Sequence, residues 1–238
     1  MTGATKPTAA VCPTTAVPRR DIVVGRHSKV WRSLSADPRL QAVAGNAISH
    51  LDLVDFQFGA SDRVWVFSYS RAPAENANLL RRIGDAGVAE VVYISSSSCV
   101  IVEMTSCYEY PRVKRLAEQQ ALTLRVGKVL TIGLVYSSED ELPAGVNVAT
   151  SLGELAEFMA SPHWPHAEGR RKQLFRVVRR PFAKEFERGL HRVYGRAITA
   201  LGRYPCLLRP VDLLLRALGM RWYGYVYLSN RRWTSTTS

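Results

Sequence analysis

Short apolar runs alternate with helical segments along the first two thirds of the chain, and this alternation constrains the fold more than any other feature. The runs are short and bounded by glycine or polar residues, as buried parallel strands are: Ile22–Val24, Ala47–Leu53, Val64–Phe67 and Val91–Ile94. Segments with apolar residues at helical spacing lie between and after them: 27–34, 73–86 and 110–122. This order predicts an α/β fold, a Rossmann-like doubly wound parallel sheet with helices on both faces.

The pattern changes in the last third of the chain. Further strands are expected at Leu124–Val126 and Val129–Leu134, and from Ser151 the apolar spacing becomes helical, with helices over 182–201 and 207–218. We therefore predict three parts. These are a flexible tail over residues 1–20, a Rossmann-like core over 21–138, and a small, basic, mostly helical substrate lobe over 139–238.

Composition excludes several classes of protein. Of the 238 residues, 47% are hydrophobic and 22% are charged, which is typical of a globular chain with a sizeable core. The four cysteines lie far apart, so neither a disulfide framework nor a zinc knuckle is expected. Residues 1–20 lack the apolar region of a secretory signal, and we expect a cytoplasmic protein. The apolar stretch 207–228 holds four charges, which argues against a transmembrane helix.

The positive charge of the chain, +12, lies entirely in its last third. Residues 1–160 hold 16 Lys and Arg against 16 Asp and Glu, whereas residues 161–238 hold 16 against 4. Such an excess is a solvated basic face, or it attracts phosphates, anionic lipid or nucleic acid. The pairs Arg170–Arg171 and Arg179–Arg180 are candidates to grip a sugar diphosphate or to lie on an anionic membrane. No nucleic-acid module is present, so we expect no nucleic-acid partner.

Tyr110 and Lys114 are four residues apart at the start of an expected helix, so their side chains share one face. A free tyrosine titrates near pH ~10, too high for a base at neutral pH. We expect the lysine to stabilise the phenolate and lower the pKa of Tyr110. The tyrosine then takes or returns a proton at a sugar hydroxyl or carbonyl.

These residues follow a strand that runs into four serines, Ser95 to Ser98. The order of the helix 76–87, the strand Val91–Ile94, the serines and Tyr110xxxLys114 resembles the extended short-chain dehydrogenase/reductase family, especially its sugar-nucleotide epimerases and dehydratases. The resemblance covers about residues 22–159. It implies that a serine orients the substrate oxygen, that Tyr110 transfers the proton, and that Lys114 also holds the nicotinamide ribose. Ser97 matches the serine as the third of the run, with Ser96 and Ser98 as alternatives.

The resemblance also implies NAD or NADP as the cofactor. The cofactor-binding candidates are Gly25, Arg26, Ser28, Asp52, Leu53, Ser68 and Lys114. Arg26 favours a 2′-phosphate, or it is a solvated arginine. Of the three glycines of the family's first turn, only Gly25 is present, because Ser28 and Trp31 stand at the other two positions. Trp31 is expected to force the first helix away from the sheet or to pack outside it.

Two functions compete. The first is an NAD(P)-dependent epimerase, dehydratase or reductase that acts on a nucleotide-sugar-like molecule, either as a monomer or as a homodimer. The second is a non-catalytic relative that keeps the fold as a binding or regulatory module. His163 and His166 flank a helix-breaking proline, and we expect no metal site there. The aromatic residues between 222 and 227 are expected to pack in a core.

Overall fold

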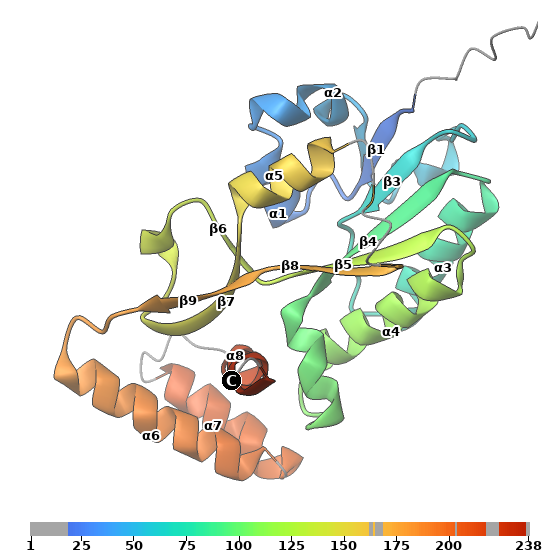
Figure 1. Cartoon of the computed structure of the whole chain (residues 1–238). Helices are drawn as coiled ribbons and strands as arrows, with labels where there is room; N and C mark the ends of the chain where they lie inside the picture. The colour runs from blue at the N-terminus through green and yellow to red at the C-terminus, as the bar shows by residue number, and fades with distance from the viewer. Residues whose placement is uncertain (1–18, 162–163, 165–168, 203, 218–223, 237–238) are drawn as a thin grey trace, which may run out of the picture.

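Six strands form one parallel sheet, in the order β2-β1-β3-β4-β5-β8, in a computed structural model that describes residues 19–161, 164, 169–202, 204–217 and 224–236 (Figure 1). Every neighbouring pair of strands in this sheet is parallel. The strands are β1 (Asp21–Val24), β2 (Ala47–Ile48), β3 (Arg63–Val66), β4 (Glu90–Ser96), β5 (Gly127–Ile132) and β8 (Arg171–Leu174).

Helices cover both faces of this sheet, as the sequence predicts. One face carries α1 (Lys29–Leu34), α2 (Gln41–Ala44) and α5 (Leu152–Ala160), and the other carries α3 (Pro73–Asp85) and α4 (Glu109–Thr123) (Figure 1). Side chains alternate between the two cores along each strand. On β1, Val23 packs in the α1 and α5 core, whereas Ile22 and Val24 pack in the α3 and α4 core. The predicted doubly wound α/β fold is confirmed.

Residues after 138 contribute to the core and, together with residues 134–136, also form a lobe. α5 and β8 belong to the layers of the large sheet. The lobe holds a three-stranded sheet, made of β6 (Leu134–Tyr136), β7 (Gly145–Ser151) and β9 (Arg176–Arg180), which the sequence prediction lacks. Three helices complete the lobe: α6 (Glu185–Leu201), α7 (Pro205–Ala217) and α8 (Gly224–Thr236). None of the helices that the structure describes has both the length and the apolar character needed to cross a membrane.

One predicted strand is shorter than expected, and another is wrong. The run from Ala47 forms a strand of only two residues, because the Asp52 carboxylate accepts a hydrogen bond from the Ser49 amide at 3.1 Å and the chain enters a 3-10 turn at Asp52–Val54. Leu124–Val126 is a turn that follows α4. The amide of Gly127 donates to the Leu124 carbonyl at 3.1 Å, so β5 begins only at Gly127. Three more 3-10 turns occur, at Pro38–Leu40, Ser97–Glu103 and Glu139–Glu141.

The last residues of the predicted tail are held by the core. Arg20 forms a salt bridge with the buried Asp62 at 2.7 Å, and Arg19 pairs with Glu90. Residues 1–18 of that tail lie outside the described residues. The folded part of the chain therefore begins before residue 21.

Trp31 is buried, with 2% of its surface exposed, so the prediction that it packs outside the core is wrong. Its ring lies 5.8 Å from that of Phe67, which follows β3. The indole thus fills the space between α1 and the sheet, where the family pattern places a glycine. The large apolar surface that it buries accounts for a tryptophan at this position.

Replacing Trp31 by alanine should lower the free energy of unfolding by about 3–5 kcal/mol, because it leaves a cavity between α1 and the sheet. Denaturant unfolding followed by circular dichroism measures this change. Arg32→Ala alters the exposed neighbour on the same helix and serves as the control. Equal stabilities for the two variants would contradict the packing described for Trp31.

Candidate active site

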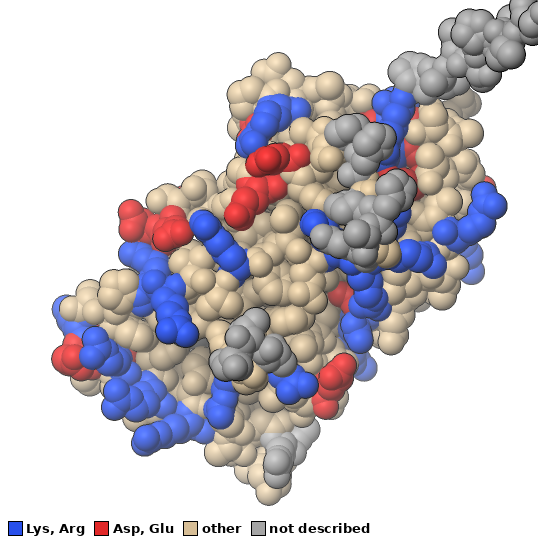
Figure 2. Space-filling model, viewed as in Figure 1, with Lys and Arg blue, Asp and Glu red and all other residues tan. Residues whose placement is uncertain are grey.

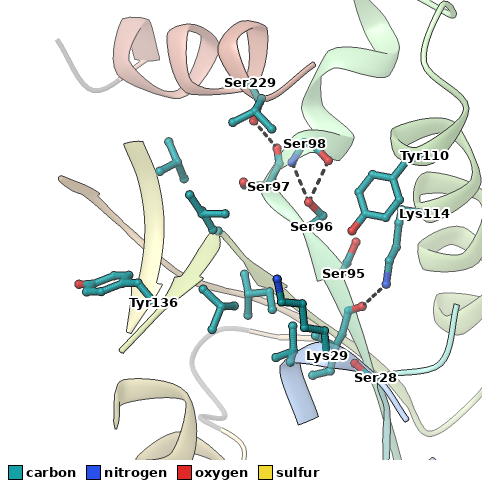
Figure 3. Close-up of a pocket in the computed structure, with 18 of the residues that line it drawn as sticks. Ser28, Lys29, Ser95, Ser96, Ser97, Ser98, Tyr110, Lys114, Tyr136 and Ser229 are labelled. Atoms are coloured by element: carbon teal, nitrogen blue, oxygen red, sulfur yellow. Dashed lines mark hydrogen bonds between the residues drawn. The ribbon is translucent and has the colours of Figure 1, made fainter. Parts of the chain in front are cut away.

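A cavity of about 830 Å³ opens at the carboxyl ends of the parallel strands (Figure 3). The strand order reverses between β1 and β3, and ligands of open α/β sheets bind beyond the carboxyl ends at such a point. Residues from the core and from the C-terminal lobe line the cavity. They include Ser28, Lys29, Tyr69, Ser95, Ser96, Ser97, Ser98, Tyr110, Lys114, Tyr136, Glu141, Tyr225, Ser229 and Asn230.

Tyr110 lies in the first turn of α4 and points toward the serine end of β4 (Figure 3). Its hydroxyl faces the Ser96 side chain. Its ring lies 5.1 Å from that of Tyr69 and 5.7 Å from that of Tyr225. Burial raises the pKa of Tyr110 well above its ordinary value, and Tyr225 raises it further, whereas the adjacent Ser96 hydroxyl lowers it. The expectation that Lys114 lowers this pKa is wrong, and the phenol is neutral at neutral pH.

Lys114 is one turn further along α4 and is 6% exposed. Its ammonium donates to the Ile94 carbonyl at 2.9 Å and lies 4.8 Å from the centre of the Tyr93 ring and 5.5 Å from that of Tyr69. Burial lowers the pKa of Lys114 from its ordinary 10.5 to about 8. A carbonyl and two ring faces thus stabilise a cation that burial disfavours.

The buried Glu118 carboxylate opposes this lowering of the Lys114 pKa. It is 2% exposed and pairs with Arg115 at 2.9 Å and Arg171 at 3.4 Å. Burial raises the pKa of the Cys99 thiol to about 11, so it is protonated at neutral pH and is a poor nucleophile. Lys114 therefore supplies the positive charge of this corner of the cavity.

The four serines have different surroundings. Ser96 and Ser98 hydroxyls lie 2.8 Å apart, and the Ser95 hydroxyl lies 3.4 Å from the Cys99 sulfur. Ser97 is 7% exposed and begins the 3-10 turn Ser97–Glu103. Of the three candidates from the sequence, the structure brings Ser96 to the Tyr110 hydroxyl. Ser97 lines the same cavity, and its assignment remains a prediction.

Helix α8 holds the serine turn in place, a role that sequence reasoning missed. The Ser229 hydroxyl and the Trp233 indole both donate to the Ser97 carbonyl, at 3.0 Å and 2.9 Å. The Asn230 side chain accepts from the Val148 amide at 3.1 Å and also donates to a β7 carbonyl. Tyr225 from the same helix forms part of the wall beside Tyr110. Only the aromatic cluster 222–227 signals this helix in the sequence, and residues 222 and 223 of it lie outside the described residues.

The predicted cofactor residues separate into two groups. Ser28 and Lys114 line the cavity, whereas Gly25, Arg26, Asp52, Leu53 and Ser68 do not. Gly25 has φ +109°, and a Cβ there would lie 2.6 Å from the Ser68 amide, so the ends of β1 and β3 approach too closely for any other residue. The amides of Gly25 and Arg26 both donate to the Ile48 carbonyl, and the Ser28 amide donates to Gly25. These three amides are already paired within the protein.

The charged residues near this turn are arranged differently from the prediction. Arg26 forms an ion pair with Asp52 at 3.4 Å, and both side chains are about half exposed. Lys29, which the sequence prediction overlooked, lines the cavity with its ammonium (Figure 3). It offers an anionic ligand a second positive charge in the wall of the cavity.

The two predicted arginine pairs do not line this cavity. Arg170 donates to the Gly127 carbonyl at 2.7 Å, and Arg180 donates to the Leu142 carbonyl at 2.6 Å, so both of them fix loops of the fold. No group of three His, Cys, Asp or Glu that could hold a metal ion occurs in the part of the chain that the structure describes, and His163 and His166 lie outside that part.

No protein-family model and no curated protein match the sequence. Several solved structures align with this one. A short-chain dehydrogenase/reductase superfamily protein from Agrobacterium tumefaciens with bound NAD is 15% identical over 68% of this chain and 79% of that chain, with a TM-score of 0.49. WbmG of Bordetella bronchiseptica, in complex with NAD and UDP, is 9% identical over 67% and 74%, with a TM-score of 0.49. UDP-N-acetylglucosamine 4-epimerase from Bacillus cereus is 10% identical over 74% and 86%, with a TM-score of 0.46.

Replacing Lys114 by methionine should raise the free energy of unfolding at pH 7, because it removes a charge that burial disfavours. The fall in pKa from 10.5 to about 8 corresponds to roughly 3 kcal/mol at ~1.4 kcal/mol per unit, less about 1 kcal/mol for the lost hydrogen bond. The unfolded chain binds more protons between these two pKa values, so the wild type gains stability as pH rises through that window. The advantage of Lys114→Met should shrink over the same window.

Denaturant unfolding at several pH values measures both effects. Lys29→Met makes the same substitution at an exposed lysine and should leave stability nearly unchanged. A Lys114→Met protein less stable than the wild type at pH 7 would show that the buried ammonium contributes net stability.

Proposed function

We propose that this chain is an NAD(P)-dependent enzyme of the epimerase, dehydratase or reductase type that acts on a nucleotide-sugar-like molecule. The observation that carries the proposal is the meeting of Tyr110, Ser96 and Lys114 in one cavity at the carboxyl ends of a parallel sheet. Each group has the chemistry that the reaction needs: a proton donor, a hydroxyl to orient the substrate oxygen, and a cation. The cavity is also large enough for a drug-sized ligand.

The residues present fit a dinucleotide better at its nicotinamide end than at its adenosine end. Lys114 and Ser28 line the cavity where the nicotinamide ribose and the adjoining phosphate would lie. The resemblance implies that Asp52 and Leu53 would hold the adenosine, but Asp52 pairs with Arg26 and Leu53 is buried in the core. When bound, the cofactor supplies or accepts hydride. NAD and NADP are both compatible with this proposal.

The protein's own groups then handle the proton. Because its pKa is raised, Tyr110 carries its proton at neutral pH and donates it to a substrate carbonyl oxygen as hydride reaches the carbon. The Ser96 hydroxyl, which faces the Tyr110 hydroxyl, orients that oxygen. The Lys114 ammonium, one turn further along the same helix, supplies positive charge to the wall of the cavity beside Tyr110. A neutral phenol favours carbonyl reduction as the step that this site performs first.

The second candidate is a non-catalytic binding module with the same fold. It is favoured by one specific observation, the pairing of the Gly25, Arg26 and Ser28 amides within the protein, which leaves these donors unavailable to a pyrophosphate. Calorimetric titration with NAD, NADH, NADP and NADPH decides between the two candidates. Binding of none of the four, by a folded protein, would favour the binding module and refute the enzyme.

Replacing Tyr110 by phenylalanine should lower turnover by about 10²–10⁴-fold while nicotinamide dinucleotide binding changes little. Only the hydroxyl is lost, and the ring contacts with Tyr69 and Tyr225 remain. The measurement is NAD(P)H oxidation at 340 nm against a panel of keto and hydroxyl nucleotide sugars. Tyr69→Phe makes the same change on a neighbouring ring of the cavity and should retain most of the rate. Full turnover by Tyr110→Phe would refute the role of this hydroxyl.

Reduction should slow as pH rises through about 8, because the Lys114 ammonium loses its proton there while Tyr110 keeps its own. A profile of kcat/KM between about pH 6 and pH 9.5 reports the pKa of such a group in the free enzyme. In Lys114→Met, this step near pH 8 should vanish from the residual activity. A wild-type profile of kcat/KM that stays flat through this range would show that the rate does not depend on the charge of Lys114.

A further inference from the structure

Helices α6 and α7 lie side by side at the end of the molecule remote from the large sheet (Figure 1). They carry a group of exposed apolar side chains, which we call the α6–α7 face. Its members are 51–76% exposed and consist of Phe186 and Val193 on α6 and of Leu207, Leu213 and Leu214 on α7. Single exposed apolar residues are ordinary on proteins, but five on two adjoining helices indicate a contact surface.

The exposure of these residues does not result from loose packing, because the opposite sides of both helices are well buried. Tyr194 and Ile198 of α6 and Leu208 of α7 are fully buried in one cluster with α8. The Tyr194 hydroxyl donates to the buried Asp212 carboxylate at 2.8 Å, which joins α6 to α7. Each helix is therefore anchored on one side and apolar on another.

Arginines outnumber carboxylates on these two helices, where Glu185 and Glu187 flank Phe186 and Glu185 pairs with Arg188 at 2.7 Å. Arg188, Arg192 and Arg196 project from α6 and Arg209 from α7, all exposed. Among the described residues, no carboxylate forms an ion pair with Arg192, Arg196 or Arg209. Lys and Arg gather over the region of α6 on the face of the molecule that Figure 2 shows. On α7, the carboxylate of Asp212 is buried and already hydrogen-bonded.

We propose that the α6–α7 face docks the protein on the surface of an anionic lipid bilayer. Helices that carry apolar side chains beside basic ones lie at the interface between bilayer and water. Their apolar side chains insert among the lipid acyl groups, and their cations contact the headgroups. A second copy of this chain is a poor occupant, because a twofold contact would bring the same unpaired arginines together. The charge of residues 161–238, 16 basic against 4 acidic, suits the negative bilayer and repels a like surface.

Flotation of the full-length protein with vesicles tests the proposal. Vesicles of phosphatidylcholine mixed with phosphatidylglycerol should carry the wild type upward, whereas vesicles of phosphatidylcholine alone should carry far less of it. Leu213→Glu/Leu214→Glu should abolish flotation. Arg192→Gln/Arg196→Gln should weaken the partition by about 30-fold at low salt, since each basic residue near such a surface contributes ~1 kcal/mol, about fivefold.

Matched variants away from the face control for general changes in charge and hydrophobicity. Leu51→Glu/Val54→Glu alters two side chains that are 73% and 68% exposed, and Arg81→Gln/Arg82→Gln removes two charges from α3. Both should float like the wild type, and circular dichroism should show that every variant is folded.

Three results would overturn the proposal. The first is the absence of wild-type flotation with anionic vesicles. The second is equal flotation by the leucine variant and the wild type. The third is a wild-type dimer in light scattering that Leu213→Glu/Leu214→Glu dissociates without any vesicle binding, which would assign the face to a second copy. None of these measurements depends on the enzymatic activity proposed above.

Discussion

Burial of the parallel sheet on both faces is the constraint on which the rest of this structure depends. Ile22, Val23 and Val24 are all fully buried, so neighbouring residues of one strand require cover on opposite sides. Helices supply that cover, and the connections between strands and helices must therefore turn at the ends of the sheet. The turns at the carboxyl ends bring Ser28, Tyr69, the serine run and the start of α4 together. The cavity is thus a product of how the core is covered.

The site retains a charge that the fold alone would not favour. Lys114 is buried among aromatic rings, with a carbonyl as its hydrogen-bond acceptor, although an apolar side chain of similar length would occupy the same space at less cost. Buried ionisable groups with strongly shifted pKa values cluster at functional sites in proteins. The same burial keeps Tyr110 protonated, so one environment sets the charge state of both groups. This coupling ties the proposed chemistry to the packing of α4 on β4.

The sequence predicts the core of the fold well and the site in part. Periodicity identifies β1, β3, β4, α3 and α4 because each of these elements is long or strongly apolar. It fails at Ala47–Leu53 and Leu124–Val126, where a side-chain hydrogen bond and a turn at the end of a helix override an apolar run. Tyr110 and Lys114 are adjacent on one helix face, so local spacing finds them. Tyr69, Tyr225 and Lys29 enter the cavity only through tertiary packing, which local spacing does not encode.

The same limit applies to Trp31. A comparison with a glycine-containing turn suggests that a large side chain would displace α1 outward, whereas in the structure the indole is itself part of the core beside Phe67. Whether a large residue disrupts a contact or fills a space depends on the shape of the facing surface. That surface is formed at the end of β3, more than thirty residues further along the chain, so the local sequence around Trp31 does not reveal it.

The hydrogen bonds from Ser229 and Trp233 to the Ser97 carbonyl span 132 and 136 residues of sequence. During synthesis, the large sheet has nearly all its strands and the cavity has most of its walls long before α8 leaves the ribosome. Before α8 packs against the serine turn, the Ser97 carbonyl lacks its two donors from α8 and is hydrogen-bonded by water. The turn is not yet held by these contacts. Contacts at such separation form late, because closing a long loop is entropically costly. The strands of the large sheet are therefore synthesised well before the helix that fixes the serine turn.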